Sequence, residues 1–177
     1  MKIRLFFLTI ICAVCFQANA QNEFQQEVIS YLTVNGTVKQ YNTVYDDMID
    51  VLKSQFSGAN VPQAEWDALR NDKPKAVSQL VRMMSSAYRK HFSQDDIAQM
   101  SKFFGSPAGV QMRINPDELD SDQRQVVGKF YSSSVARKID EVKIDLTTDV
   151  SQISEFWSRD LFNSTMNSLI AKGYSPQ

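Results

Sequence analysis

Apolar residues recur at steps of three and four along nearly the whole chain, and this spacing limits the fold most strongly. Such residues share one face of a helix, whereas a half-buried strand needs alternation with period two, which no segment shows convincingly. The clearest run is Val135, Ile139, Val142, Leu146, Val150, Ile153, Trp157 and Leu161. It predicts a long C-terminal helix that continues to Lys172, with a break near Thr147 and Thr148 left open. We predict an all-α fold, a compact helical bundle of six to eight helices.

Residues that start and stop helices divide the rest of the chain. Gly36 follows an apolar-periodic segment and fits the position after a helix. Pro62 and Pro74 each stand where a new helix would begin. Ser93 is a candidate N-cap, and Asp96 three residues later gives a weak form of the capping box.

The first 20 residues have the pattern of a secretory signal peptide. Lys2 and Arg4 supply positive charge, residues 5–16 form an apolar run, and Ala18–Ala20 places small residues at a cleavage site. The apolar run is too short for a stable membrane anchor. We therefore expect cleavage after Ala20 and an exported, periplasmic (secreted) chain.

Both cysteines, Cys12 and Cys15, fall within this leader. A lipoprotein signal anchored through Cys15 is the alternative, but Val14 is larger than the residue such sites prefer before the cysteine. The residues after the leader hold no cysteine, so they can form no disulfide and no thiolate site. We expect residues 21–177 to make one helical domain.

The charge pattern argues against nucleic acid as a partner. Without Lys2 and Arg4, 17 basic residues face 20 acidic ones, and the charges are scattered with no basic stripe. No later segment reaches 18 consecutive apolar residues, so we expect no transmembrane segment in the mature chain.

The segment FFGSPAG, residues 103–109, is typical of a sharp junction between two helices. We expect Gly105 to end one helix in the left-handed conformation. Ser106 would cap the next helix and Pro107 would take its first position. Gly109, one turn in, would let another backbone come close.

Two clusters supply candidate binding residues. A basic spot near a helix end suits either a solvated face or an anion or phosphate headgroup. The aromatics at the junction have helical spacing and are expected in the core, with at least one buried against the helix of residues 88–92; the alternative is a ligand contact at the next helix's N-terminus. The candidates are Arg89, Lys90, His91, Phe103, Phe104 and Ser106.

Motifs for catalysis, metals and cofactors are missing from the sequence. The single histidine, His91, excludes two-histidine zinc motifs. An EF-hand loop starting at Asp117 would need Gly where Asp122 stands and Glu where Gly128 stands, so the acidic loop is better read as a helix cap. We predict no catalytic residues, no metal and no cofactor. Whether the chain is an enzyme is left open, with a non-catalytic role favoured.

A weak internal echo appears when the sequence is shifted by 27 residues. Residues 95–112 then align with residues 122–139, with four identities in 18 positions. Asp95, Lys102, Phe103 and Ser106 meet Asp122, Lys129, Phe130 and Ser133. Two similar helical corners explain this as well as a duplication does.

Residues 88–112, YRKHFSQDDIAQMSKFFGSPAGVQM, resemble the core motif of the bacterial family called domain of unknown function 2059 (DUF2059). The matching positions are Tyr88, Phe92, Ser93, Asp96, Phe103, Phe104, Ser106, Pro107 and Gly109. Phe104 stands where Tyr is usual, and Asp96 where Glu is. A looser similarity covers about residues 27–116, which leaves about 117–177 as a C-terminal helical extension. The resemblance implies an exported helical domain and no particular activity.

Two functions of different classes fit these features. The first is a non-catalytic module that binds another periplasmic or envelope protein through an exposed helical groove. The second is a carrier that holds a lipid or another apolar ligand between its helices, as the aromatic and methionine content would allow. An enclosed apolar cavity would favour the carrier, and an open apolar groove on a solid core would favour the module.

Overall fold

The computed structural model describes residues 21–177, and every regular element in that range is a helix. In chain order the elements are residues 21–34, α2 (Thr37–Gln55), α3 (Gln63–Asn71), α4 (Lys73–His91), α5 (Gln94–Phe104), α6 (Pro107–Ile114), the 3-10 turn η1 (Pro116–Glu118), α7 (Ser121–Tyr131) and α8 (Ser134–Ala171). The predicted all-α fold and its long C-terminal helix are confirmed. The predicted signal peptide lies outside the described residues.

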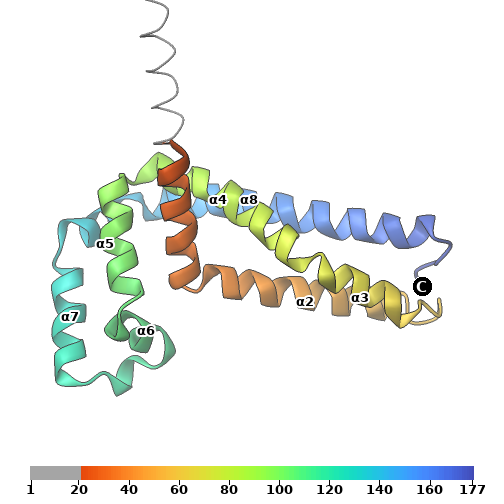
Figure 1. Ribbon diagram of the computed structural model, residues 1–177, viewed down its shortest axis with the longest axis horizontal. Helices are drawn as coiled ribbons and strands as arrows, with labels where there is room; N and C mark the ends of the chain where they lie inside the picture. Colours follow the sequence, from red (N-terminus) through yellow and green to blue (C-terminus); the bar gives the residue numbers. More distant parts are fainter. Residues whose placement is uncertain (1–20) are drawn as a thin grey trace, which may run out of the picture.

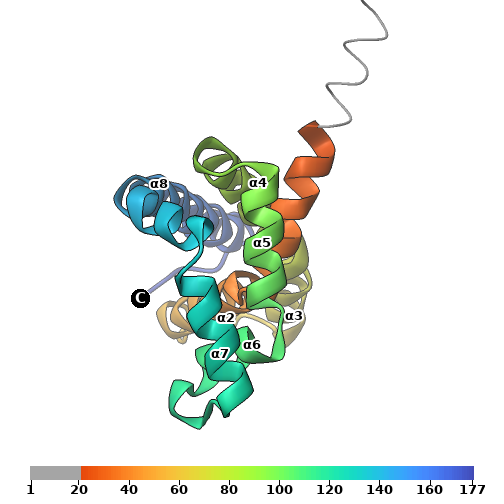
Figure 2. The ribbon, with the colours of Figure 1, turned by 90° about the vertical axis from the view of Figure 1, so that its left-hand side faces the viewer.

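The helices form a long part and a short part (Figure 1). In the long part, α8 and α2 both pack on α4, and α3 covers the far end of α2. In the short part, α5 and α7 run in opposite directions, and α6 joins them at the bottom (Figures 1 and 2). The helix of residues 21–34 stands where the two parts meet (Figure 1).

The helix ends follow the signals in the sequence. Gly36 has φ +92°, a left-handed conformation that only glycine adopts without strain, and α2 begins at the next residue. Ser93 caps α5 by accepting from the Asp96 amide, and the Asp96 carboxylate accepts from the Ser93 amide in return. The capping box predicted at this position is therefore present.

The long C-terminal helix passes through the two threonines without a break. α8 contains 38 residues, which makes it roughly 57 Å long at 1.5 Å per residue. The Thr148 hydroxyl donates to the Ile144 carbonyl one turn back at 2.9 Å, so the side chain is satisfied inside the helix. The helix ends before Gly173, which has φ +92°.

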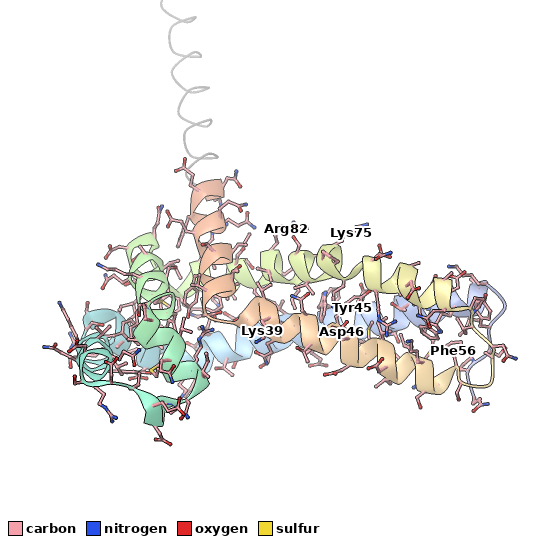
Figure 3. All side chains as sticks on the ribbon, turned by 60° about the horizontal axis from the view of Figure 1, so that its bottom comes forward. Lys39, Tyr45, Asp46, Phe56, Lys75 and Arg82 are labelled. Atoms are coloured by element: carbon pink, nitrogen blue, oxygen red, sulfur yellow. The ribbon has the colours of Figure 1, made fainter. Side chains whose placement is uncertain are left out.

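Large aromatic side chains fill the core of the long part, and their polar groups donate hydrogen bonds to backbone carbonyls. Tyr45 of α2 and Phe56, the residue directly after this helix, are almost fully buried; both are labelled in Figure 3. The Tyr45 hydroxyl donates to the Leu69 carbonyl at 2.6 Å, which joins α2 to α3. Trp157 of α8 donates from its indole N–H to the Ala76 carbonyl of α4 at 3.1 Å. These bonds leave no buried donor on either ring unsatisfied.

One prediction about the junction is wrong. Gly105 does not adopt the left-handed conformation: its φ is −85° and its ψ is −9°. The chain turns at Ser106 instead, which is extended with φ −76° and ψ 157° and caps α6 directly. Because this single extended residue redirects the chain, the α5 terminus needs no left-handed residue.

Candidate functional site

A surface groove of about 400 Å³ opens on the short part, where the last turns of α5 and α7 face each other. It is lined by Gln99, Lys102, Phe103, Ser106, Val126, Lys129, Phe130 and Ser133. These eight residues form four pairs that are 27 positions apart. We call this feature the twin-corner groove.

The backbones of the two corners have nearly the same conformation. Gly105, the residue that ends α5, has φ −85° and ψ −9°, and Ser132, which ends α7, has φ −87° and ψ −3°. The caps that follow are Ser106, with φ −76° and ψ 157°, and Ser133, with φ −78° and ψ 165°. The internal echo in the sequence thus corresponds to two structurally equivalent helix–helix corners.

The two capping serines also make equivalent hydrogen bonds. The Ser106 hydroxyl donates to the Phe103 carbonyl at 2.7 Å and accepts from the Gly109 amide at 3.1 Å. The Ser133 hydroxyl likewise donates to the Phe130 carbonyl at 2.6 Å and accepts from the Ala136 amide at 3.3 Å. Each hydroxyl therefore closes its own corner and has its donor already in use.

The floor of the groove is a pair of stacked phenylalanine rings. The rings of Phe103 and Phe130 lie 3.9 Å apart between centroids, with 5° between their planes. Their exposed fractions are 5% and 9%, so most of each ring is removed from water. Phe104 and Tyr131, the next residue of each corner, meet these rings edge-on. This stack holds α5 and α7 together at their C-terminal ends.

Gly109 makes the first corner as tight as it is. A Cβ atom built on Gly109 would collide with the carbonyl oxygen of Phe103 and would lie 2.9 Å from the Cα of Phe104. The backbone of α6 therefore approaches the end of α5 more closely than any side chain would permit. The close approach predicted for Gly109 is confirmed.

The rim of the groove carries positive charge that no carboxylate of residues 21–177 balances. Lys102 and Lys129 are both exposed, and neither makes an ion pair within residues 21–177. No aspartate or glutamate lines the groove. Asp95, one of the nearby acids, is engaged at 2.7 Å by the Gln99 amide. The groove thus combines an apolar floor with two unpaired cations.

The predicted basic spot lies elsewhere and is occupied by contacts within the fold. Asp149 of α8 accepts from Lys90 at 2.8 Å and lies 2.7 Å from His91 Nε2, which ties α8 to the end of α4. Hydrogen bonds from Lys90 and then His91 lower the pKa of the Asp149 carboxyl. Arg89 lies over the ring of Phe24, 5.8 Å from its centroid. None of the three basic residues lines the twin-corner groove.

The candidates at the junction have different surroundings. Phe103 is buried as predicted, although its stacking partner is Phe130 of α7. Phe104 turns away from the groove and meets Tyr31 edge-on at 5.9 Å, and Tyr31 in turn meets Tyr88 at 5.6 Å. Burial raises the pKa of both tyrosine hydroxyls. This chain of rings connects the short part to the long part.

Sequence reasoning missed six of the eight residues that line the groove, Gln99 and Val126 among them. Lys102, Lys129, Phe130 and Ser133 were not among the candidate binding residues, yet all four line the groove. The signal that could have found them is the 27-residue echo, because three of its four identities are the lysine, phenylalanine and serine pairs. The echo identifies these groove residues only once it is known that the two corners face each other in the fold.

A second, larger groove lies between α2 and α8 in the long part, with a volume of about 500 Å³ and a mostly apolar surface. Val44, Met48, Val51 and Phe162 supply its apolar side chains. It is also open to solvent. Within residues 21–177, no group of three or more potential ligands is placed to hold a metal ion. None of the helices in that range has the length and apolar character needed to cross a membrane.

Comparison with known proteins gives one match, to a family. No curated protein and no solved structure matches the chain. The family model described as "Uncharacterized protein conserved in bacteria (DUF2059)" covers residues 78–112. That segment includes α5 and the first corner, whereas the second corner lies beyond it. The resemblance seen in the sequence is thereby confirmed: the chain carries the DUF2059 motif over residues 78–112.

Proposed function

We propose that this protein is an exported, non-catalytic helical module that binds another periplasmic or envelope protein through the twin-corner groove. One observation carries the proposal: an open groove of about 400 Å³ with a stacked Phe103–Phe130 floor and two lysines at its rim that form no ion pair within residues 21–177. Apolar surface that remains accessible beside polar groups is typical of a protein-binding site, and here Val126, 45% exposed, supplies more of that surface than the two rings, which are 5% and 9% exposed. The leader of residues 1–20 supports the expected export.

The shape of the groove favours a protein partner over a stored lipid. A carrier must surround most of its ligand, since sites for small apolar molecules bury the greater part of the ligand surface. The twin-corner groove is open to solvent rather than enclosed. A protein segment can lie in such a groove because its remaining surface stays in contact with water or with its own fold.

The carrier stays as the second candidate, with the groove between α2 and α8 as the place for an apolar ligand, although that groove is open to solvent rather than enclosed. That groove is the larger of the two, and its lining is largely apolar. Native mass spectrometry of the protein purified from its own host would show a bound lipid directly. A stoichiometric lipid would favour the carrier over the module.

Site-specific photo-crosslinking tests the module. A photo-reactive amino acid would replace Val126, which lines the groove and is 45% exposed. The matched control would replace Ile144, an 81% exposed apolar residue of α8. In cells of the organism that makes the protein, we expect a discrete protein adduct at residue 126 and none at residue 144. No adduct at residue 126, or equal adducts at both positions, would contradict the proposal.

A further inference from the structure

We propose that the twin-corner groove recognises an acidic peptide segment in which one large apolar side chain is flanked by carboxylates. The apolar side chain would lie on the Phe103–Phe130 floor, and the carboxylates would pair with Lys102 and Lys129. This inference rests on the proposed function, because it names the chemistry of the partner at the same groove. Three features of the described residues support it.

The first feature is the state of the lysines. Elsewhere in the described chain, Lys73, Lys90 and Lys138 each have a carboxylate oxygen within 2.9 Å, on Asp46, Asp149 and Asp96 respectively. Lys102 and Lys129 have none within residues 21–177, and the same holds for Lys39, Lys53, Lys75 and Lys143, but Lys102 and Lys129 line one groove together. Two like charges on one groove attract an anionic ligand and repel a cationic one.

The second feature is the apolar floor between the charges. The lysine of each corner directly precedes its phenylalanine, and the two phenylalanine rings are stacked. The helices α5 and α7 run in opposite directions (Figures 1 and 2), and each supplies one lysine to the lining of the groove. Val126 adds further apolar surface. A ligand with its apolar group between two anionic groups matches this order.

The third feature concerns the remaining polar groups. The hydroxyls of Ser106 and Ser133 already donate to carbonyls within their own corners. The Gln99 amide donates to Asp95. The lysine ammonium groups are thus the strongest free donors of the groove, and they bind a carboxylate more strongly than a neutral acceptor.

Selection from a displayed library of random twelve-residue peptides tests the inference on the full chain after removal of residues 1–20. We expect enrichment of peptides in which aspartate or glutamate flanks a phenylalanine, leucine, isoleucine or tryptophan. The affinity of one enriched peptide, labelled with a fluorophore, would then be measured by anisotropy. We expect its binding to weaken as salt is raised, since the lysines are exposed.

Two charge-reversal variants provide the matched comparison. Lys102→Glu/Lys129→Glu removes the cations of the groove, and Lys39→Glu/Lys143→Glu makes the same change in net charge at exposed lysines outside it. We expect the first variant to lose about tenfold or more in affinity for the enriched peptide and the second to stay near the wild type. The neutral variant Lys102→Gln/Lys129→Gln should fall between them.

The outcomes separate this inference from the proposed function. Enrichment of basic or uncharged peptides, or equal losses in both charge-reversal variants, overturns the acidic peptide. If residue 126 still crosslinks to a protein in cells, the proposed protein-binding function is retained and only the acidic nature of the partner is wrong. Binding to vesicles of phosphatidylglycerol is the last measurement. If the vesicles bind the wild type but not Lys102→Glu/Lys129→Glu, and no peptide is enriched, the ligand is a lipid headgroup and the inference is wrong.

Discussion

Ser106 and Ser133 are structurally equivalent caps, 27 residues apart, with φ and ψ angles that agree within 8°. Each begins the helix that leaves its corner, α6 or α8, and each accepts from the amide three residues on. Equivalent geometry at two sites in one chain allows the same substitution to be compared in two backgrounds.

We expect Ser106→Ala and Ser133→Ala each to lower the free energy of unfolding by about 1 kcal/mol, because each removes an N-cap acceptor. Urea denaturation monitored by circular dichroism would measure both. Replacement by aspartate, which can also accept from the amide, should recover most of the loss. A change within about 0.5 kcal/mol in either alanine variant would show that its cap contributes no more than an ordinary surface residue.

Phe103→Ala should cost roughly 3–5 kcal/mol of unfolding free energy, the usual range for a core phenylalanine. Phe130→Ala should cost a comparable amount, because the two rings bury each other. A double-mutant cycle on the pair should give a coupling energy of about 0.5–1.5 kcal/mol. Strict additivity would mean that the stacked rings do not interact in solution.

Two glycine substitutions should have opposite effects. Gly109→Ala would force the new Cβ against the backbone of residues 103 and 104, so we expect a loss of more than about 2 kcal/mol. Gly128→Ala lies inside α7 with no atom within 4 Å of the added Cβ. We expect it to stabilise the protein by about 0.5–1 kcal/mol, the helix-propensity difference between the two residues. Thermal unfolding of both variants would test the contrast.

Acid should weaken the attachment of α8 to α4 and α5. The pKa of Asp149 is lowered by hydrogen bonds from Lys90 and His91. Burial works to raise the pKa of Asp96, but hydrogen bonds from Lys138 and Ser93 outweigh it and leave the value lowered. A carboxyl group whose folded pKa lies below its unfolded value of about 3.9 stabilises the fold above that pH. The stabilisation is lost as pH falls through the lowered folded value.

The unfolding free energy should therefore drop below about pH 4, and Asp149→Asn should make this drop shallower while lowering stability at pH 7. Urea denaturation at intervals between pH 7 and pH 3 would measure both effects. Asp145→Asn, an exposed aspartate of the same helix, is the control. Equal acid profiles for wild type and Asp149→Asn would remove this aspartate from the explanation.

The signal peptide predicted for residues 1–20 leads to an expectation about the intact mass. We expect the protein recovered from its host to begin at Gln21 and to contain no cysteine, so dithiothreitol should leave its melting temperature unchanged. Mass spectrometry would establish the first residue. A diacylated Cys15 would instead place the protein on a membrane surface.

Periodicity and capping residues were enough to predict the helices. Steps of three and four predicted α8, and the signals at Gly36 and Ser93 gave helix ends that the structure confirms. These features are local, because each depends on residues within one or two turns. Gly105 shows the limit of local reasoning: glycine permits the left-handed conformation, but the extended Ser106 made it unnecessary.

The groove could not be predicted, because it depends on which helices meet. Nothing near Phe103 in the sequence indicates that its ring stacks on Phe130, 27 residues away in another helix. At the basic spot, tertiary packing instead removed a binding site that the sequence suggested. Lys90 and His91 looked free in the sequence, but their partner Asp149 approaches from a helix nearly 60 residues further on. Pairings at this separation are set by tertiary packing.

The order of the helices along the chain affects how the long part can assemble. α4 packs on α2, which precedes it, and on α8, which is made last. Contacts of such long sequence separation form late, after the local ones. As synthesis proceeds, α5, α6 and α7 can pack against one another before α8 exists. The side of α4 that α8 covers is still exposed at that stage. That side of α4 therefore stays in contact with water until α8 has been made.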